Sequence, residues 1–415
     1  MGRRIVPTTI VAAALAFAVA AISAGLTTER PRLWGAAIAL VVLGGITPMI
    51  YTVNLRILPV FSRRTWRRPR VLIAGMLVAL AGAWLTYLGR AVGVAVVETL
   101  GALAALAGGM LYAGCVIALF RSAPTTASAP PLPFPEQTAV DAVGVRFTRM
   151  AGVYLLAGLL TGVVLRFWTP DRGRWDLVWA HALLLGWFLS MASGVCYHVL
   201  PRWTGARWRT PRLITPHFHS VQLALPLMLL ALALDSKLLF MVAGPLLVVS
   251  FLLFLLNVAP LVVRLPALSR LGVSLAALFL VAGILLGGTF ALHTVTGARL
   301  RLAHAELNLF GWSGLLICGV GYYLFPRFAG QPLRWPRLAH AQIITQASGV
   351  LLSAGAWWWR AYVSDSSDLE IALGGLVTGL GMLLFAVIIA ATFRGAGRVV
   401  VSNIVLQPRR VTRPS

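Results

Sequence analysis

The sequence predicts an all-α membrane protein whose chain crosses the bilayer many times. Of its 415 residues, 59% are hydrophobic and only 11% are charged, and the mean hydropathy is +0.86. A soluble domain carries roughly 25% charged residues, so this composition excludes a soluble globular enzyme and a disordered chain. The apolar runs are long and uninterrupted, whereas the strands of a membrane barrel would alternate apolar and polar residues. Helices satisfy their own backbone inside lipid, and we therefore expect a helical bundle.

The basic residues show how the chain lies in the membrane. The chain has 35 Lys and Arg against 11 Asp and Glu, which gives a net charge of +24. All of the basic residues except Lys237 are Arg, and most lie in short segments between apolar runs. This pattern follows the positive-inside rule, so we expect a lipid bilayer partner, no nucleic-acid partner, and both termini in the cytoplasm. The Lys-poor, Arg- and Ala-rich usage is typical of a GC-rich bacterial genome, and we expect the bacterial inner membrane.

Twelve apolar runs are long enough to cross the hydrocarbon layer, which takes about 20 helical residues. They lie at residues 5–26, 33–61, 71–89, 93–120, 147–168, 176–200, 213–235, 237–263, 268–292, 301–326, 339–362 and 369–393. Segment 121–146 is rich in Pro, Ala, Ser and Thr, and we expect a flexible cytoplasmic loop there. Residues 394–415 are expected to form a basic cytoplasmic tail. Cys115, Cys196 and Cys318 lie inside apolar runs, which predicts packing residues rather than disulfides.

A threefold internal repeat organises these runs. Three segments align without gaps from Gly44, Gly186 and Gly311. In each segment the Gly is followed by a Pro, an aromatic residue, a second Pro and an Arg. The spacing of these residues is the same in all three segments. The sequence therefore predicts one membrane domain, 1–415, built from three units of four helices at 1–120, 147–263 and 268–393. The first run resembles a signal peptide, but the repeat requires it, so we expect it to be retained as a helix.

Few ionisable side chains lie inside the apolar runs, and such residues are candidates for function. His181 precedes Pro201 by the same number of positions as Glu306 precedes Pro326. The repeat thus places them at the same depth on equivalent faces, with His304 slightly further out. We expect His181, His304 and Glu306 to converge in the interior. No His/Cys pairing at zinc spacing is present, whereas two imidazoles on facing helices suit a heme iron.

Two segments resemble a known family. Trp179-Ala180-His181, followed at the end of the same apolar run by Pro201, is similar to helix 6 of subunit I of the heme–copper oxidase superfamily, in its C-type branch. His304-Ala305-Glu306, followed by Gly311-Trp312 and by Tyr322-Tyr323 before Pro326-Arg327, is similar to helix 10 of that subunit. The resemblance implies that His181 corresponds to a ligand of the active-site copper and His304 to the ligand of the high-spin heme.

The same comparison reveals departures from the family. Glu306 stands where a second His binds the low-spin heme, and the second span has no His for the other side of that heme. Ala231 and Leu232 stand where two further copper ligands are expected. The resemblance therefore implies a single heme b and an incomplete copper site. The run 303–311 also resembles, with different spacing, the H-x-H-E-M-L-F-G motif of the NnrS family, heme- and copper-binding membrane proteins linked to nitric oxide stress.

These observations lead to one main hypothesis and two alternatives. The main hypothesis is a heme b-binding membrane protein of oxidase-like fold that handles nitric oxide or another diatomic gas. His304 would bind the heme, His181 would approach its other face, and Glu306 would orient a ligand or carry a proton. Electrons would come from a small donor protein or a quinol. One alternative is an active, divergent NO reductase or terminal oxidase, which needs a second metal. The other is a cofactor-free transporter or assembly factor, whose buried polar groups line a path.

Overall fold

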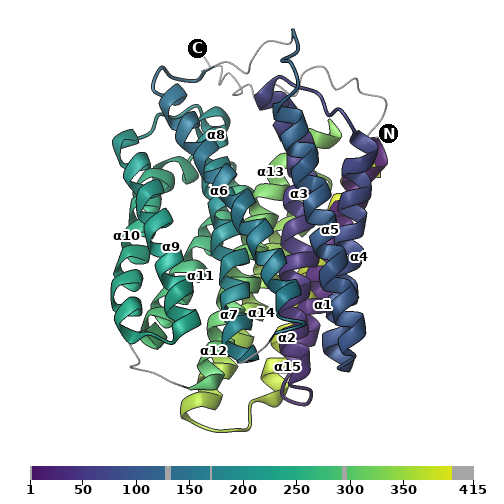
Figure 1. Ribbon diagram of the computed structural model, residues 1–415, viewed down its shortest axis with the longest axis vertical. Coiled ribbons are helices and arrows are strands. Elements are labelled where there is room, and N and C mark those ends of the chain that lie inside the picture. The colour runs from purple at the N-terminus through teal and green to yellow at the C-terminus, as the bar shows by residue number, and fades with distance from the viewer. Residues whose placement is uncertain (1, 127–131, 169–170, 292–296, 395–415) are drawn as a thin grey trace.

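The computed structural model describes residues 2–126, 132–168, 171–291 and 297–394. Long helices run side by side along one axis, and this part of the chain contains no strand (Figure 1). Eleven helical spans within it are long and apolar enough to cross a membrane. The all-helical, multi-pass membrane architecture expected from the composition is confirmed.

Three spans contain a π-helical segment. The elements in chain order are α1 (Gly2–Gly25), α2 (Arg32–Ala39), η1 (Leu40–Ile46), α3 (Thr47–Ser62), α4 (Pro69–Val92), α5 (Ala95–Phe120), α6 (Gln137–Val164), α7 (Arg172–His181), η2 (Ala182–Leu189), α8 (Ser190–Thr204), η3 (Pro211–Leu213), α9 (Ile214–Leu234), α10 (Lys237–Val262), α11 (Ala267–Ala291), α12 (Ala298–Glu306), η4 (Leu307–Gly314), α13 (Leu315–Ala329), α14 (Pro336–Tyr362) and α15 (Asp368–Arg394). The segments η1, η2 and η4 are π-helices that continue directly into their neighbours. We call the resulting continuous helices 32–62, 172–204 and 298–329 the inner spans.

The inner spans repeat the same backbone irregularity in the same register. Their π-helices begin one turn before the repeated glycine, at Leu40, Ala182 and Leu307. Their last turns are followed by left-handed residues with φ of 54°, 65° and 66°, at Arg63, Gly205 and Gly330. A left-handed residue of this kind ends a helix, because its N–H and the next one bond to the last helical carbonyls. Helices of the π type are rare overall, and those that occur are frequently found at functional sites. The backbone supports the threefold repeat, while the division into three four-helix units remains a prediction.

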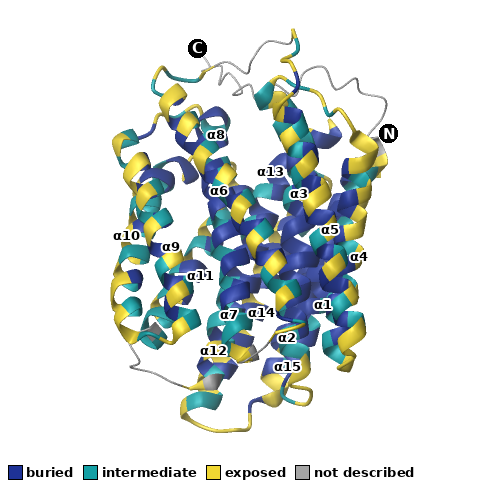
Figure 2. Ribbon diagram, viewed as in Figure 1, coloured by how far each residue is buried: buried dark blue, intermediate teal, exposed yellow. Residues whose placement is uncertain are grey.

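The inner spans form the centre of the bundle and the other helices surround them (Figure 2). In the most apolar stretch of the inner span 298–329, 89% of the residues are buried, against 11% in α10, which faces outward. Around this centre α5 packs on α6, α10 packs on α11, and α15 packs on α1. The last helix therefore closes on the first, and α1 belongs to the packed bundle.

One boundary prediction was wrong. Helix α6 begins at Gln137, so residues 137–146 of the expected loop 121–146 are helical. Gln137 is fully buried, and its amide donates to Asp141 Oδ1 at 2.7 Å and to the Tyr197 carbonyl at 2.9 Å. These bonds tie the first turn of α6 to α8, which the local composition does not indicate. Residues 127–131 of that loop and 395–415 of the expected tail lie outside the described residues.

Helix α14 accounts for the difference between twelve expected spans and the eleven found. It has 27 residues and packs along α15, but its sequence includes buried glutamines that lower its hydropathy. Tyr322 donates to Gln342 at 2.9 Å, Gln342 donates to Gln346 at 2.8 Å, and Gln346 donates to the Phe310 carbonyl at 3.1 Å. Phe310 lies in η4, where π-helical winding alters the backbone hydrogen bonds. The polar face of α14 thus supports the π-helix of the inner span.

Glycines set the close contact between α4 and α5, and this predicts a test of the packing. A Cβ at Gly82 would lie 2.8 Å from the Gly101 carbonyl oxygen. Small residues allow such backbone approach between membrane helices, so Gly82→Ala should overpack the interface and cost about 1–3 kcal/mol. Thermal unfolding in detergent should show a lower midpoint for this variant. Gly114→Ala in α5 is the matched control, because a Cβ there meets no atom within 4 Å. Equal midpoints for both variants would contradict the close contact.

Candidate functional site

The structure brings two of the three predicted site residues together. His181 is the last residue of α7 and His304 lies in α12, so each comes from an inner span just before its π-helix. Their ring centres are 6.4 Å apart and their planes are inclined by 25°. Both side chains are half-buried. Residues that are far apart in the sequence thus face each other inside the bundle.

Both imidazoles are oriented by backbone carbonyls. His181 Nδ1 lies 2.8 Å from the Leu177 carbonyl oxygen, and His304 Nδ1 lies 2.8 Å from the Gly283 carbonyl oxygen. A carbonyl only accepts, so each Nδ1 carries the hydrogen and each Nε2 presents its lone pair. Neither Nε2 has a hydrogen-bond partner within the described ranges of the chain. A histidine that binds a metal through Nε2 typically has this tautomer and donates its Nδ1–H to a carbonyl in the same way.

A glycine face on α11 receives the His304 ring. A Cβ at Gly287 would lie 2.8 Å from His304 Cε1 and 3.2 Å from its Nδ1. One turn earlier, Gly283 leaves room for Asn308, whose amide donates to the His304 carbonyl at 2.7 Å. Phe290 meets the ring edge-on at a centre distance of 5.9 Å. The position of His304 therefore depends on the absence of side chains at two sites on the neighbouring helix.

Glu306 does not join the two histidines. Its side chain is 1% exposed and lies beside Ser353 of α14, and its Oε1 has no hydrogen-bond partner among the residues described. Successive residues of a helix are rotated by about 100°, so residues 304 and 306 point to nearly opposite sides of the inner span. The sequence placed Glu306 at the correct depth, but the structure turns it toward α14.

No cluster of three or more His, Cys, Asp or Glu side chains that could hold one metal ion occurs in the described part of the chain. Three other histidines within it have separate partners, and His219 is exposed near the start of α9. His217 Nδ1 is 2.7 Å from the Tyr197 hydroxyl, His198 pairs with Asp141 at 2.9 Å, and His340 lies at the surface near Pro336. His293 lies outside the described residues. The site therefore offers two imidazoles as its donor set.

A second buried polar cluster connects α4, α5 and the end of α6 to the inner span 172–204, and the sequence did not indicate it. Glu98 of α5 accepts from Arg90 Nε at 2.7 Å and pairs with Arg166, which follows the end of α6. Arg90 also reaches Asp176 at 3.1 Å and lies over the Trp179 ring at 5.1 Å. The side chains of Arg90, Glu98 and Arg166 are each at most 9% exposed. The two arginines come from helix ends, where sequence alone suggests solvated charges.

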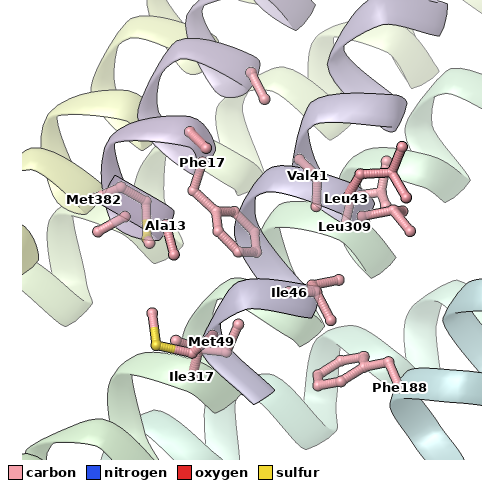
Figure 3. Close-up of a cluster of buried hydrophobic side chains, with 14 of the residues drawn as sticks. Ala13, Phe17, Val41, Leu43, Ile46, Met49, Phe188, Leu309, Ile317 and Met382 are labelled. Atoms are coloured by element: carbon pink, nitrogen blue, oxygen red, sulfur yellow. The ribbon is translucent and has the colours of Figure 1, made fainter. Parts of the chain in front are cut away.

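The interior between the first and third inner spans is filled by side chains (Figure 3). Phe17 of α1 is fully buried there, together with Leu309 of η4 and Met382 of α15. An ideal Cβ at Gly314 of η4 would lie 3.9 Å from the Phe17 ring.

An apolar cavity lies on the far side of the π-helices from the histidines. Its volume is about 130 Å³, and its walls come mainly from α3, α8, α10, α11 and α13. The lining includes Ile46, Phe188 and Leu316, and it contains no histidine. Phe188 lies about two helical turns beyond His181, which is about 10 Å along a helix. The cavity and the histidine pair are therefore separate features.

Comparison with known proteins identifies the fold. No protein-family model and no curated protein sequence matches this chain. A heme-copper terminal oxidase dimer solved by cryo-electron microscopy is similar over 94% of this chain and 84% of the other, with a TM-score of 0.63 and 14% sequence identity. Identity at this level speaks for the fold and not for the activity. The chain is thus a multi-pass membrane protein with the fold of a heme-copper terminal oxidase.

Proposed function

We propose that the protein binds one heme b between His304 and His181 and handles nitric oxide or another diatomic gas in a bacterial inner membrane, with both termini cytoplasmic. The observation that carries this proposal is the facing pair of imidazoles with unpartnered Nε2 atoms. Two imidazoles that each bind one metal at about 2 Å place their ring centres about 6 Å apart. The 6.4 Å between the two ring centres fits two imidazoles that would hold one iron between them.

Each residue of the site has a defined task in this proposal. His304 supplies the proximal nitrogen, and the Gly283 carbonyl fixes its tautomer and direction. His181 occupies the opposite side, where its Nε2 lone pair would bind the iron as a sixth ligand,. Bound heme would supply an iron that binds diatomic gases and exchanges one electron. Glu306 faces away, so its proposed role is to carry a proton near the site rather than to touch a ligand.

The surroundings support one heme and no complete copper site. Phe17 fills the space beside the first inner span, and Glu306, which replaces the second heme ligand of the family, faces α14. The two imidazoles have no third donor beside them in the described residues, which favours gas handling over an active NO reductase or terminal oxidase. The proposed electron source is a small donor protein or a quinol.

An absorption spectrum of the detergent-purified chain tests the proposal. Oxidised and dithionite-reduced spectra, with a pyridine hemochrome assay, should show about one heme b per chain. Nitric oxide should then shift the Soret band of the reduced protein. A colourless preparation from heme-replete cells would overturn the proposal and favour the cofactor-free transporter or assembly factor. A stoichiometric non-heme metal beside the heme would instead favour the active enzyme.

A pair of adjacent glycines provides a finer prediction. Gly287→Ala should displace the His304 ring, because its Cβ would lie 2.8 Å from Cε1. Outer contacts of metal-binding histidines typically contribute about 10–100-fold in affinity, so we expect heme affinity to fall by about tenfold or more in a titration of the apoprotein. Gly288→Ala is the matched control, since a Cβ there meets no atom within 4 Å. If both variants bind heme like the unmodified chain, His304 is not the ligand.

A further inference from the structure

The lining of the apolar cavity described above reaches the basic turn between α10 and α11. Its walls include Val258 and Val262 near the end of α10, and Leu265 and Ser269 at the turn into α11. Helix α10 is 11% buried in its most apolar stretch, so it faces the lipid over most of its length. The cavity therefore lies behind a wall of helices that contacts the bilayer.

Two basic side chains are adjacent in the chain to this part of the lining. Arg264 and Arg270 lie on either side of Leu265 and Ser269, and both are exposed. Arg270 donates to the Val263 carbonyl at 3.0 Å, which holds it across the turn between α10 and α11. Neither guanidinium forms an ion pair with a carboxylate of the described residues. The turn between α10 and α11 thus carries two positive charges that no carboxylate of the described residues neutralises.

The lining of the cavity also contains an unpartnered polar group. Trp203, near the end of α8, lines the cavity, and its buried Nε1 has no hydrogen-bond acceptor among the residues described. Its ring packs on Tyr323 of α13 at a centre distance of 4.5 Å. An unpartnered indole N–H in a buried position costs free energy, so a carbonyl of a bound molecule would be a favourable acceptor.

We propose that this cavity binds one anionic phospholipid. Its phosphate lies at Arg264 and Arg270, an ester carbonyl accepts from Trp203 Nε1, and an acyl chain fills the apolar interior. Two basic side chains, an unpartnered hydrogen-bond donor and an apolar interior are the three features that would hold these groups of a phospholipid. Basic pockets between membrane helices on the cytoplasmic side are a recurring kind of site for anionic lipid headgroups. The site does not depend on heme or on the histidine pair.

Lipid binding to the purified, delipidated full chain tests the proposal by native mass spectrometry and by the thermal midpoint. Phosphatidylglycerol and phosphatidylcholine with the same acyl chains are the two probes. We expect tighter binding and a larger rise in the midpoint with phosphatidylglycerol. The double variant Arg264→Gln/Arg270→Gln should lose about 30-fold in phosphatidylglycerol affinity, since each basic residue near an anionic lipid contributes about fivefold.

Two further variants make the test specific. Arg67→Gln/Arg68→Gln removes the same charge from an exposed turn after α3, away from the cavity, and should bind like the unmodified chain. Ala192→Leu places a larger side chain into the cavity lining and should weaken both lipids. Equal binding of the two lipids, or equal losses in the two arginine variants, would overturn the proposal. A co-purified quinone that Ala192→Leu releases would show a different occupant and would also overturn it.

Discussion

His304→Ala should abolish heme binding, and the purified variant should lose the Soret band. The structure gives His304 a carbonyl partner at Nδ1, an unpartnered Nε2 and a glycine face on α11 that fixes the ring. Alanine removes the proximal nitrogen and leaves no other donor in the same place. The measurement is the heme content per chain by pyridine hemochrome, for preparations of equal monodispersity.

Two companion variants make this result interpretable. His340→Ala is the matched control, because His340 is exposed at the start of α14, and it should retain full heme content. His181→Ala should retain heme but change the spin state of the iron, since the opposite face is then open. A His304→Ala protein with a full Soret band would show that the heme, if present, lies elsewhere in the bundle.

Glu98→Gln should cause a large loss of stability for a single substitution. Glu98 pairs with Arg90 and Arg166, and all three side chains are at most 9% exposed. Removing one partner of a buried pair leaves an uncompensated charge and costs about 3–5 kcal/mol. We expect a clearly lower midpoint in thermal unfolding, followed by the loss of monodisperse protein on size exclusion.

Restoring the charge balance should recover part of this loss. In Glu98→Gln/Arg166→Gln one charge of each sign is removed, so the double variant should be more stable than the sum of the single effects predicts. Glu29→Gln makes the same chemical change at an exposed position and should leave the midpoint unchanged. A Glu98→Gln protein as stable as the Glu29→Gln control would show that the cluster is solvated.

Composition and hydropathy were sufficient to predict an all-helical, multi-pass membrane protein. Apolar runs of about 20 residues have no stable alternative to helices that span lipid. The repeated Gly, Pro and Arg positions also predicted where the inner spans end, since a Pro near a helix end and a left-handed residue after it stop the helix in each copy. The residues 137–146 were misjudged because Gln137 and Asp141 look like loop residues until their partners on α8 are known.

The sequence by itself determined the depth of His181, His304 and Glu306, because the repeat sets the distance of each from a helix end. Only the tertiary structure decided which of them meet. A rotation of about 100° per residue turns His304 toward His181 and Glu306 toward α14,. The rotation of a span about its own axis is fixed by packing against distant helices, here by the glycine face of α11 and the glutamines of α14. The residues next to His181 and His304 in the chain do not indicate those contacts. The pairing of the two histidines could therefore be found only in the folded protein.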